Sequence, residues 1–142
     1  ANPVIGRQKL DLDINELSFS REISKARTFG FMKDAEKLRE RGLALGASFD
    51  NAIVLDNCDV LNPGGLRYAD EFVRHKVLDA LGDLVTLGKP LIGHLILYRA
   101  GHDLMNRLVK KISESPESYR EIELGADLRF DSVGTHMLWA FS

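Results

Sequence analysis

The two residues of this sequence whose types and spacing most directly suggest chemistry are His75 and Asp79. They lie four positions apart in residues 70–83, whose pattern predicts a helix, so their side chains lie one turn apart on one side. An imidazole and a carboxylate at that spacing can bind one metal ion, as helices do when they present zinc ligands. Two ligands do not complete a zinc site, so the third has to come from elsewhere.

The alternative interpretation is that this pair lies on a solvated helix face. On a helical wheel the apolar residues of the segment fall on the side away from the pair; they are Val73, Val77, Ala80, Leu81, Leu84 and Val85. Gly82 favours a site, because a glycine within a helix costs up to about 1 kcal/mol relative to alanine. A glycine beside the pair leaves room for a ligand to approach.

Three further side chains are candidates for roles in the same chemistry. His102 follows a glycine, and it is either a catalytic residue or a turn or cap residue. Asp83 lies one turn beyond Asp79 and could orient a histidine from elsewhere, or it is simply solvated near the helix end. Lys76 could bind a phosphate, although exposed lysines are common.

Thr28 and Phe29 form a fourth candidate, because they precede Gly30 at the end of a predicted strand. A hydroxyl there could donate a hydrogen bond to an oxyanion, and the ring could stack on a sugar. The alternative is an ordinary strand end. His94 and His136 have no motif around them, and we interpret both as structural or surface residues.

Composition limits the class of protein. The chain has 142 residues, of which 44% are hydrophobic and 28% charged, as expected of one soluble globular domain. The net charge of −2 gives no basic surface for nucleic acid or membranes. A single cysteine, Cys58, suits a reducing compartment, and no apolar run approaches a membrane span. No signal peptide is visible, and the missing initiator Met suggests a processed product or an excerpt.

The elements that must position these side chains alternate between strands and helices, with two long helices, which predicts an α+β fold. Gly42 is expected to end the first clear helix and Asp70 to cap the longest one. Residues 119–142 carry few signals and stay mostly unassigned. The predicted strands are 8–19, 26–31, 52–55 and 91–98, the predicted helices are a short one from Ser20, then 32–41, 69–87 and 103–112, and the predicted turn is 62–65.

Several short motifs occur in a fixed order along the chain: NPVIG at 2–6, ARTFGF at 26–31, DNAIV at 50–54, VLN at 60–62, GLR at 65–67, DEFVRHKVLDALGD at 70–83 and GH at 101–102. Together they resemble the C-terminal half of the zinc-dependent UDP-3-O-acyl-N-acetylglucosamine deacetylases of lipid A synthesis. The resemblance runs to about residue 112 and fades beyond 120. We therefore expect a C-terminal deacetylase domain at 1–120, with an insert at about 30–56, and an unassigned tail at 121–142.

The resemblance implies a fold and a set of catalytic residues. The fold is a mixed sheet packed on two long helices with a small βαβ insert, one half of a two-domain β-α-α-β sandwich. His75 and Asp79 would be two of three protein ligands of Zn²⁺. The third ligand and a glutamate base would lie in an N-terminal half that this chain lacks. His102 would be a catalytic histidine held by Asp83, and Thr28 would help to hold the oxyanion.

The resemblance also implies substrate contacts. Phe29 and Lys76 would contact the sugar and its diphosphate side. The insert would form a passage for the acyl chain, lined by Met32, Ala35, Leu38, Ala44 and Val54. Ala47 replaces a usual glycine and adds a methyl group near this passage, and the RAGH segment at 99–102 replaces a usual KSGH. These departures affect details of sugar contact and passage shape.

The function implied is metal-assisted hydrolysis of the N-acetyl group of UDP-3-O-acyl-N-acetylglucosamine in lipopolysaccharide synthesis, in the cytoplasm of a Gram-negative bacterium. The chain would be inactive without the N-terminal half, unless His94 or His136 completes the zinc site. One alternative is an isolated module that binds a nucleotide sugar or an acyl chain without turnover. Another is an unrelated regulatory or metal-storage use. Neither nucleic acid nor an integral membrane segment is expected.

Overall fold

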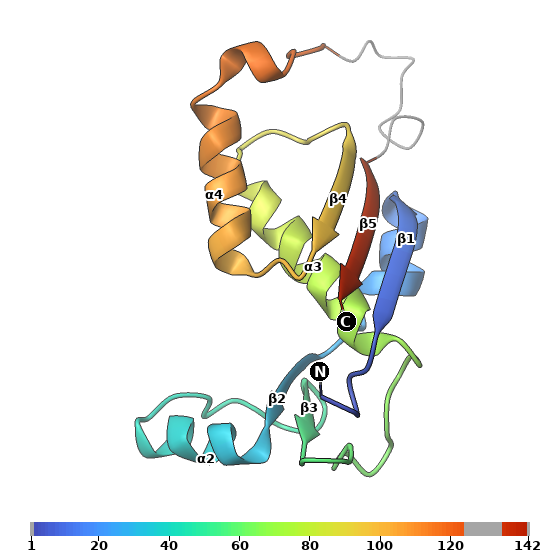
Figure 1. The fold of residues 1–142 in the computed structure, drawn as a ribbon, viewed down its shortest axis with the longest axis vertical. Helices are drawn as coiled ribbons and strands as arrows, with labels where there is room; N and C mark the ends of the chain where they lie inside the picture. The colour runs from blue at the N-terminus through green and yellow to red at the C-terminus, as the bar shows by residue number, and fades with distance from the viewer. Residues whose placement is uncertain (1, 124–134, 142) are drawn as a thin grey trace.

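A computed structural model describes residues 2–123 and 135–141 of the protein. Its strands and helices confirm the predicted α+β class (Figure 1). The longest helices are α3 and α4, as the spacing of apolar residues predicts. The elements in chain order are β1 Gln8–Ile14, α1 Glu16–Ser18, a π-helical turn Phe19–Ile23, β2 Thr28–Phe31, α2 Met32–Glu40, β3 Ala52–Leu55, α3 Glu71–Val85, β4 His94–Tyr98, α4 His102–Ser113, a 3-10 turn Pro116–Ser118 and β5 Thr135–Phe141.

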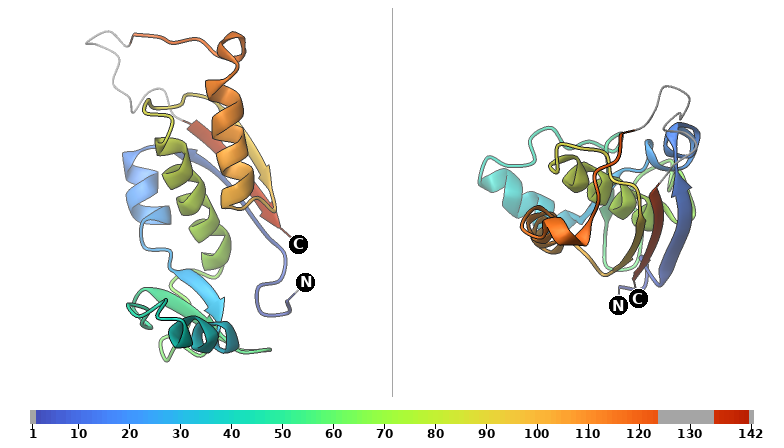
Figure 2. Two further views of the ribbon diagram at one scale, coloured as in Figure 1. Left: turned by 90° about the vertical axis from the view of Figure 1, so that its left-hand side faces the viewer. Right: turned by 90° about the horizontal axis from the view of Figure 1, so that it is seen from above.

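The larger part of the fold is a three-stranded sheet in the order β1-β5-β4. The sheet is mixed, because β5 pairs antiparallel with β1 and parallel with β4. The long helices α3 and α4 lie together on one side of it (Figure 2). The core between these layers consists of Ile23, Val73, Val77, Ala80, Leu84, Leu97, Ala100, Met105, Met137 and Trp139.

A small βαβ unit forms the other end of the molecule. Strands β2 and β3 pair in parallel, and α2 connects them (Figure 1). A second apolar core joins this unit to the first turn of α3, and it consists of Ile53, Leu55 and Phe72. Helix α3 therefore contributes to both cores, and it is the element through which the two parts of the fold are held together.

The ends of the helices follow the predicted glycine signals. Gly42 follows α2 with φ +73°, and Gly88 follows α3 with φ +74°, conformations that a glycine adopts without strain. Asp70 occupies the N-cap of α3, but its side chain makes no cap hydrogen bond and pairs with Arg74 instead. Among the described residues, no helix has the length and apolar character that crossing a lipid bilayer requires.

The structure corrects the predicted elements at three places. The first helical segment begins at Glu16, before Ser20, because Asn15 and Ser18 form a capping box there. Strand β4 begins only at His94. The largest difference is β5, which lies in the unassigned 121–142 segment and is nevertheless the central strand of the sheet. The three-stranded unit thus reaches Phe141, while 124–134 and 142 lie outside the described residues.

Candidate active site

The predicted metal pair lies in the middle of α3, with both side chains partly buried. His75 Nε2 is 3.2 Å from Asp79 Oδ1. His75 Nδ1 is 3.2 Å from the carbonyl oxygen of Ala26, which can only accept, so Nδ1 carries a proton and donates. In the neutral ring, Nε2 of His75 then carries a lone pair, and this lone pair lies next to Asp79 Oδ1. Such an arrangement is stabilised by a cation between the two atoms, either a proton or a metal ion.

The charge of Asp79 suits a metal ligand. Lys76 Nζ donates to Asp79 Oδ2 at 2.6 Å, while His75 lies against Oδ1. Burial by itself would raise the pKa of Asp79, but the contacts with His75 and Lys76 outweigh burial and lower that pKa to about 2. The ionised carboxylate is the form that binds metal. An oxygen ligand is therefore ready beside a nitrogen ligand at neutral pH.

This donor set fits zinc but supplies only part of a site. Catalytic zinc usually has three protein ligands, drawn from nitrogen, oxygen and sulfur, and one open position. Within 2–123 and 135–141, no three His, Cys, Asp or Glu side chains are grouped so that they could hold a metal ion. A Cβ added at Gly82 would meet no heavy atom of the described chain within 4 Å, so the helix beside the pair is open.

A second polar pair lies one turn further along α3. His102 is the first residue of α4, and its Nδ1 lies 2.9 Å from Asp83 Oδ2 and 3.1 Å from Asp83 Oδ1. The carboxylate accepts from Nδ1, which leaves Nε2 of the exposed ring directed away from the pair. The i, i+4 spacing of His75, Asp79 and Asp83 places all three on one stripe of α3. The proximity of α3 and α4 then brings His102 to the end of this stripe.

The predicted sugar-contact residues surround His75. The ring of Phe29 packs edge-on against His75, with 6.2 Å between centroids, and against Phe72 at 5.0 Å. Lys76 Nζ lies 5.5 Å from the centroid of the Phe29 ring. Thr28 is exposed at the start of β2. The tertiary fold therefore brings Phe29 of β2 to the metal pair and to Lys76, which already lies beside them on α3.

The predicted passage residues all lie in the βαβ unit and its connections. Met32 and Leu38 are exposed on α2. The smaller side chains are partly buried: Ala35 on α2, Ala44 and Ala47 in the α2–β3 connection, and Val54 on β3. Every residue from Met32 to Glu40 is exposed or half-buried, so α2 presents apolar side chains that the described core does not cover.

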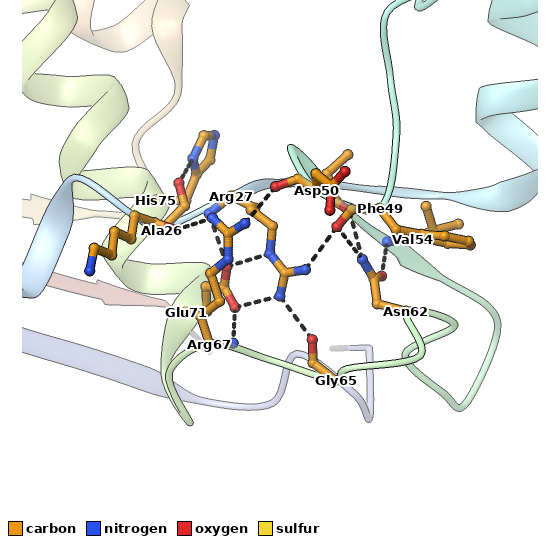
Figure 3. A network of polar contacts seen from close by, with 12 residues as sticks. Ala26, Arg27, Phe49, Asp50, Val54, Asn62, Gly65, Arg67, Glu71 and His75 are labelled. Atoms are coloured by element: carbon orange, nitrogen blue, oxygen red, sulfur yellow. Dashed lines mark hydrogen bonds and ion pairs between the residues drawn. The ribbon is translucent and has the colours of Figure 1, made fainter.

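A buried ion pair next to the site was not predicted from the sequence. Glu71 lies one helical turn before His75 on the face away from the apolar stripe, yet its side chain is completely buried. Arg27, also buried, binds it through Nε and Nη2 at 2.9 and 3.0 Å (Figure 3). The sequence signal for this pair was the charged Arg27 within the β-prone ARTFGF motif. Only the fold identifies Glu71 as its partner.

The two remaining histidines lie on the sheet. His136 of β5 contacts Asp11 and Asp13 of β1 through its two ring nitrogens. Hydrogen bonding to Asp13 raises the pKa of His136 above its ordinary value, with Asp11 adding to the effect. The ring of His94 packs edge-on against that of His136, with 4.6 Å between centroids. Both histidine side chains thus make contacts between neighbouring strands of the sheet.

Comparison with known proteins identifies the family. The model of the UDP-3-O-acyl N-acetylglycosamine deacetylase family matches residues 1–114. The chain is 65% identical over 138 residues to the UDP-3-O-acyl-N-acetylglucosamine deacetylase of Bdellovibrio bacteriovorus, covering 97% of this chain and 45% of that protein. It is 54% identical to the enzyme of the same name from Myxococcus xanthus, covering 93% of this chain and 44% of the relative. The chain belongs to this deacetylase family.

The matched length has a direct consequence for the site. The chain spans less than half the length of these relatives, and it corresponds to their C-terminal portion. The predicted metal pair, His75 and Asp79, therefore belongs to a chain that matches less than half of these relatives.

Proposed function

We propose that this chain is the C-terminal part of a zinc-dependent deacetylase that hydrolyses the N-acetyl group of UDP-3-O-acyl-N-acetylglucosamine. The observation that carries the proposal is the convergence of His75, Asp79, Asp83 and His102 along one stripe of α3, in a chain of this family. The name of the family supports this choice of substrate. The reaction belongs to lipid A synthesis in the cytoplasm of a Gram-negative bacterium.

His75 Nε2 and Asp79 Oδ1 would hold the zinc ion, with the third ligand supplied by an N-terminal half. Bound zinc would lower the pKa of a coordinated water and polarise the acetyl carbonyl. The ionised state of Asp79 and the Nδ1–H tautomer of His75 prepare these two atoms for that role. A further hydrogen bond orients each ligand. The carbonyl of Ala26 accepts from His75, and Lys76 donates to Asp79.

His102 would act on the leaving group. Hydrolysis breaks the amide C–N bond, adds water to form acetate and delivers a proton to the departing amine. The imidazole of His102 can donate that proton from Nε2, since Asp83 accepts from Nδ1 and orients the ring. Thr28 would donate its hydroxyl proton to the oxyanion that forms on the acetyl oxygen.

Substrate binding would divide between the two parts of the fold. Phe29 would pack on the sugar, and Lys76 would contact the diphosphate. The half-buried and exposed apolar side chains of the βαβ unit would line a passage for the acyl chain: Met32, Ala35, Leu38, Ala44, Ala47 and Val54. Residues 1–120 would form the C-terminal deacetylase domain, joined by β5 from the following segment.

An N-terminal half of the same enzyme is the proposed protein partner. Exposed apolar side chains on the two long helices support this, with Val85 of α3 75% exposed and Leu104 of α4 47% exposed. Packing of a second helical layer on α3 and α4 would cover them and would bring the missing ligand and base to the metal pair.

The test joins residues 1–142 to the N-terminal portion of the Bdellovibrio bacteriovorus relative, since the two proteins are 65% identical over the shared length. We expect bound zinc and release of acetate from UDP-3-O-acyl-N-acetylglucosamine by this chimera. The chain alone is the control, and it should not turn over. Turnover by the chain alone would contradict the missing-ligand argument, and an inactive, folded chimera would contradict the deacetylase assignment. Binding of substrate without turnover in both would favour a binding module.

A further inference from the structure

The Glu71 carboxylate is buried, and both of its oxygens accept hydrogen bonds. It is the first residue of α3, and it accepts four hydrogen bonds. The donors are Arg27 N and Nε on Oε1, at 3.0 and 2.9 Å, and Arg27 Nη2 and Arg67 N on Oε2, at 3.0 and 2.6 Å. Burial by itself would raise the pKa of Glu71, but these hydrogen bonds outweigh burial and keep the pKa below its ordinary value. Glu71 is therefore an anion at neutral pH.

The other donors of Arg27 connect separate segments of the chain. Nη1 donates to the carbonyl of Phe49 at 3.0 Å, and Nη2 donates to that of Gly65 at 2.8 Å. The Arg27–Glu71 pair thus joins α3, the entry to β2, the loop before β3 and the 62–65 turn (Figure 3). A buried ion pair often adds less stability than apolar residues of the same volume would. The geometry that the Arg27–Glu71 pair determines is therefore of more interest than its stability.

One peptide unit lies between this anion and the metal pair. The N–H of the Ala26–Arg27 peptide donates to Glu71 Oε1, and the C=O of the same peptide accepts from His75 Nδ1. In a trans peptide these two groups point in opposite directions. Glu71 and His75 lie one helical turn apart on α3, so they hold the peptide from its two ends. Figure 3 shows this chain of contacts from Glu71 through Arg27 and Ala26 to His75.

From this geometry we propose that Glu71 is a positioning residue for His75, acting through the Ala26–Arg27 peptide. The carboxylate orients the N–H, the N–H determines where the carbonyl points, and the carbonyl selects the Nδ1–H tautomer of His75. Nε2 is then free to bind a cation beside Asp79. Hydrogen bonds in series also polarise one another, so the anion makes the imidazole a stronger donor of its Nε2 lone pair. This inference rests on the proposed role of His75 as a metal ligand.

A purely structural role makes a different prediction. If the ion pair only fastened the βαβ unit to α3, its replacement by apolar residues would change stability and leave His75 as it was. If Glu71 positions His75, the replacement changes the tautomer and the metal affinity even where the fold is retained. The two roles are therefore separable in a variant that folds.

The experiment compares Glu71→Gln and the double variant Arg27→Met/Glu71→Leu with the unmodified 142-residue chain. The readouts are the tautomer of His75, from the ¹⁵N shifts of its ring nitrogens, and the affinity for Zn²⁺ added alone. We expect both variants to populate the Nε2–H tautomer and to bind Zn²⁺ about 10- to 100-fold more weakly, the range found when outer partners of metal ligands are removed. Asp70→Asn is the matched control, because it breaks an ion pair with Arg74 at the start of the same helix.

A folded double variant that keeps the Nδ1–H tautomer and the Zn²⁺ affinity of the unmodified chain would overturn the proposal. Unfolding of both variants would also count against it, in favour of a structural role. The tautomer comparison needs neither turnover nor substrate. If the unmodified chain binds Zn²⁺ no better than His75→Ala does, the metal assignment fails, and the tautomer result still decides the role of Glu71.

Discussion

At the scale of single residues, the site depends on which atoms of α3 carry charge and which carry protons. Asp79 is ionised because Lys76 donates to Oδ2 and His75 lies against Oδ1. His75 is held in one tautomer because the carbonyl of Ala26 accepts from Nδ1. His102 is held by Asp83. Each of these contacts joins residues of predicted importance, and each defines a substitution whose effect is specific.

The lowered pKa of Asp79 predicts a pH-dependent contribution to stability. A folded-state pKa of about 2, below the ordinary value of 3.8, means that the ionised group stabilises the fold above about pH 4, and that this contribution is lost as pH falls towards 2. Asp79→Asn should lower the free energy of unfolding by about 1–2 kcal/mol near neutral pH and by much less near pH 2. Urea unfolding across this range measures it. Asp34→Asn, on the exposed face of α2, is the control; equal losses at both ends of the range would refute the prediction.

The assigned roles predict opposite effects for two alanine variants of the chimera. His102→Ala should retain zinc and lose about 10²- to 10⁴-fold in turnover, the usual contribution of a general acid. Asp79→Ala should lose zinc, since it removes a ligand. Metal content and initial rates, measured on the same preparations, test both. Loss of zinc in His102→Ala with retention in Asp79→Ala would exchange the two roles.

At the scale of elements, β3 depends on a side chain outside the strand. The buried side chain of Asn62 accepts from Val54 N at 2.8 Å and donates to the carbonyls of Ala52 and Phe49, at 2.8 and 3.1 Å. It therefore takes the place of a neighbouring strand along one edge of β3. The four-residue strand would otherwise leave these backbone groups without partners in a partly buried position.

Asn62→Ala should destabilise the βαβ unit more than the three-stranded sheet. Three lost hydrogen bonds at a buried position predict about 1–3 kcal/mol. Amide hydrogen exchange should increase at residues 52–55 and stay nearly unchanged in β1 and β4. Asn57→Ala, at an exposed position in the same connection, should have little effect. Uniformly increased exchange in all strands would show that the two parts unfold together.

At the scale of the whole molecule, the fold is closed by its last described strand. β5 pairs with β1 on one edge and β4 on the other, so the sheet exists only when the chain has returned from α4. Met137 and Trp139 of β5 are buried against α3 and complete the larger core. The part of the chain with the weakest sequence signals thus has the largest number of strand partners.

Trp139→Ala should cost about 3–5 kcal/mol, because it leaves a large cavity in the only core shared by the described sheet and the long helices. Thermal unfolding of the chain measures the loss. Ile96→Ala is the control, since Ile96 lies on neighbouring β4 with 68% of its surface exposed and should change stability little. Removal of residues 121–142 should abolish the cooperative transition; a cooperative transition in that truncated chain would contradict the central role of β5.

The local features of this protein could be predicted from its residues alone. Helical periodicity located α3 and placed His75, Asp79 and Asp83 on one stripe, since i, i+4 spacing is a property of the helix alone. Glycines marked the helix ends, and short apolar runs located β2 and β3. Residue motifs identified the family, which the comparisons confirm. Each of these signals is local, since it depends on residues close together in the sequence or on the order of short motifs along it.

Contacts between residues far apart in the sequence became visible only in the folded protein. Glu71 shares a helix face with His75 that periodicity assigns to solvent, and the βαβ unit buries it against Arg27, 44 positions earlier in the chain. β5 has few signals of its own because its pairing partners, β1 and β4, specify it from far away in sequence. Long-range packing of this kind reverses a local preference wherever a polar group finds enough partners to offset its burial.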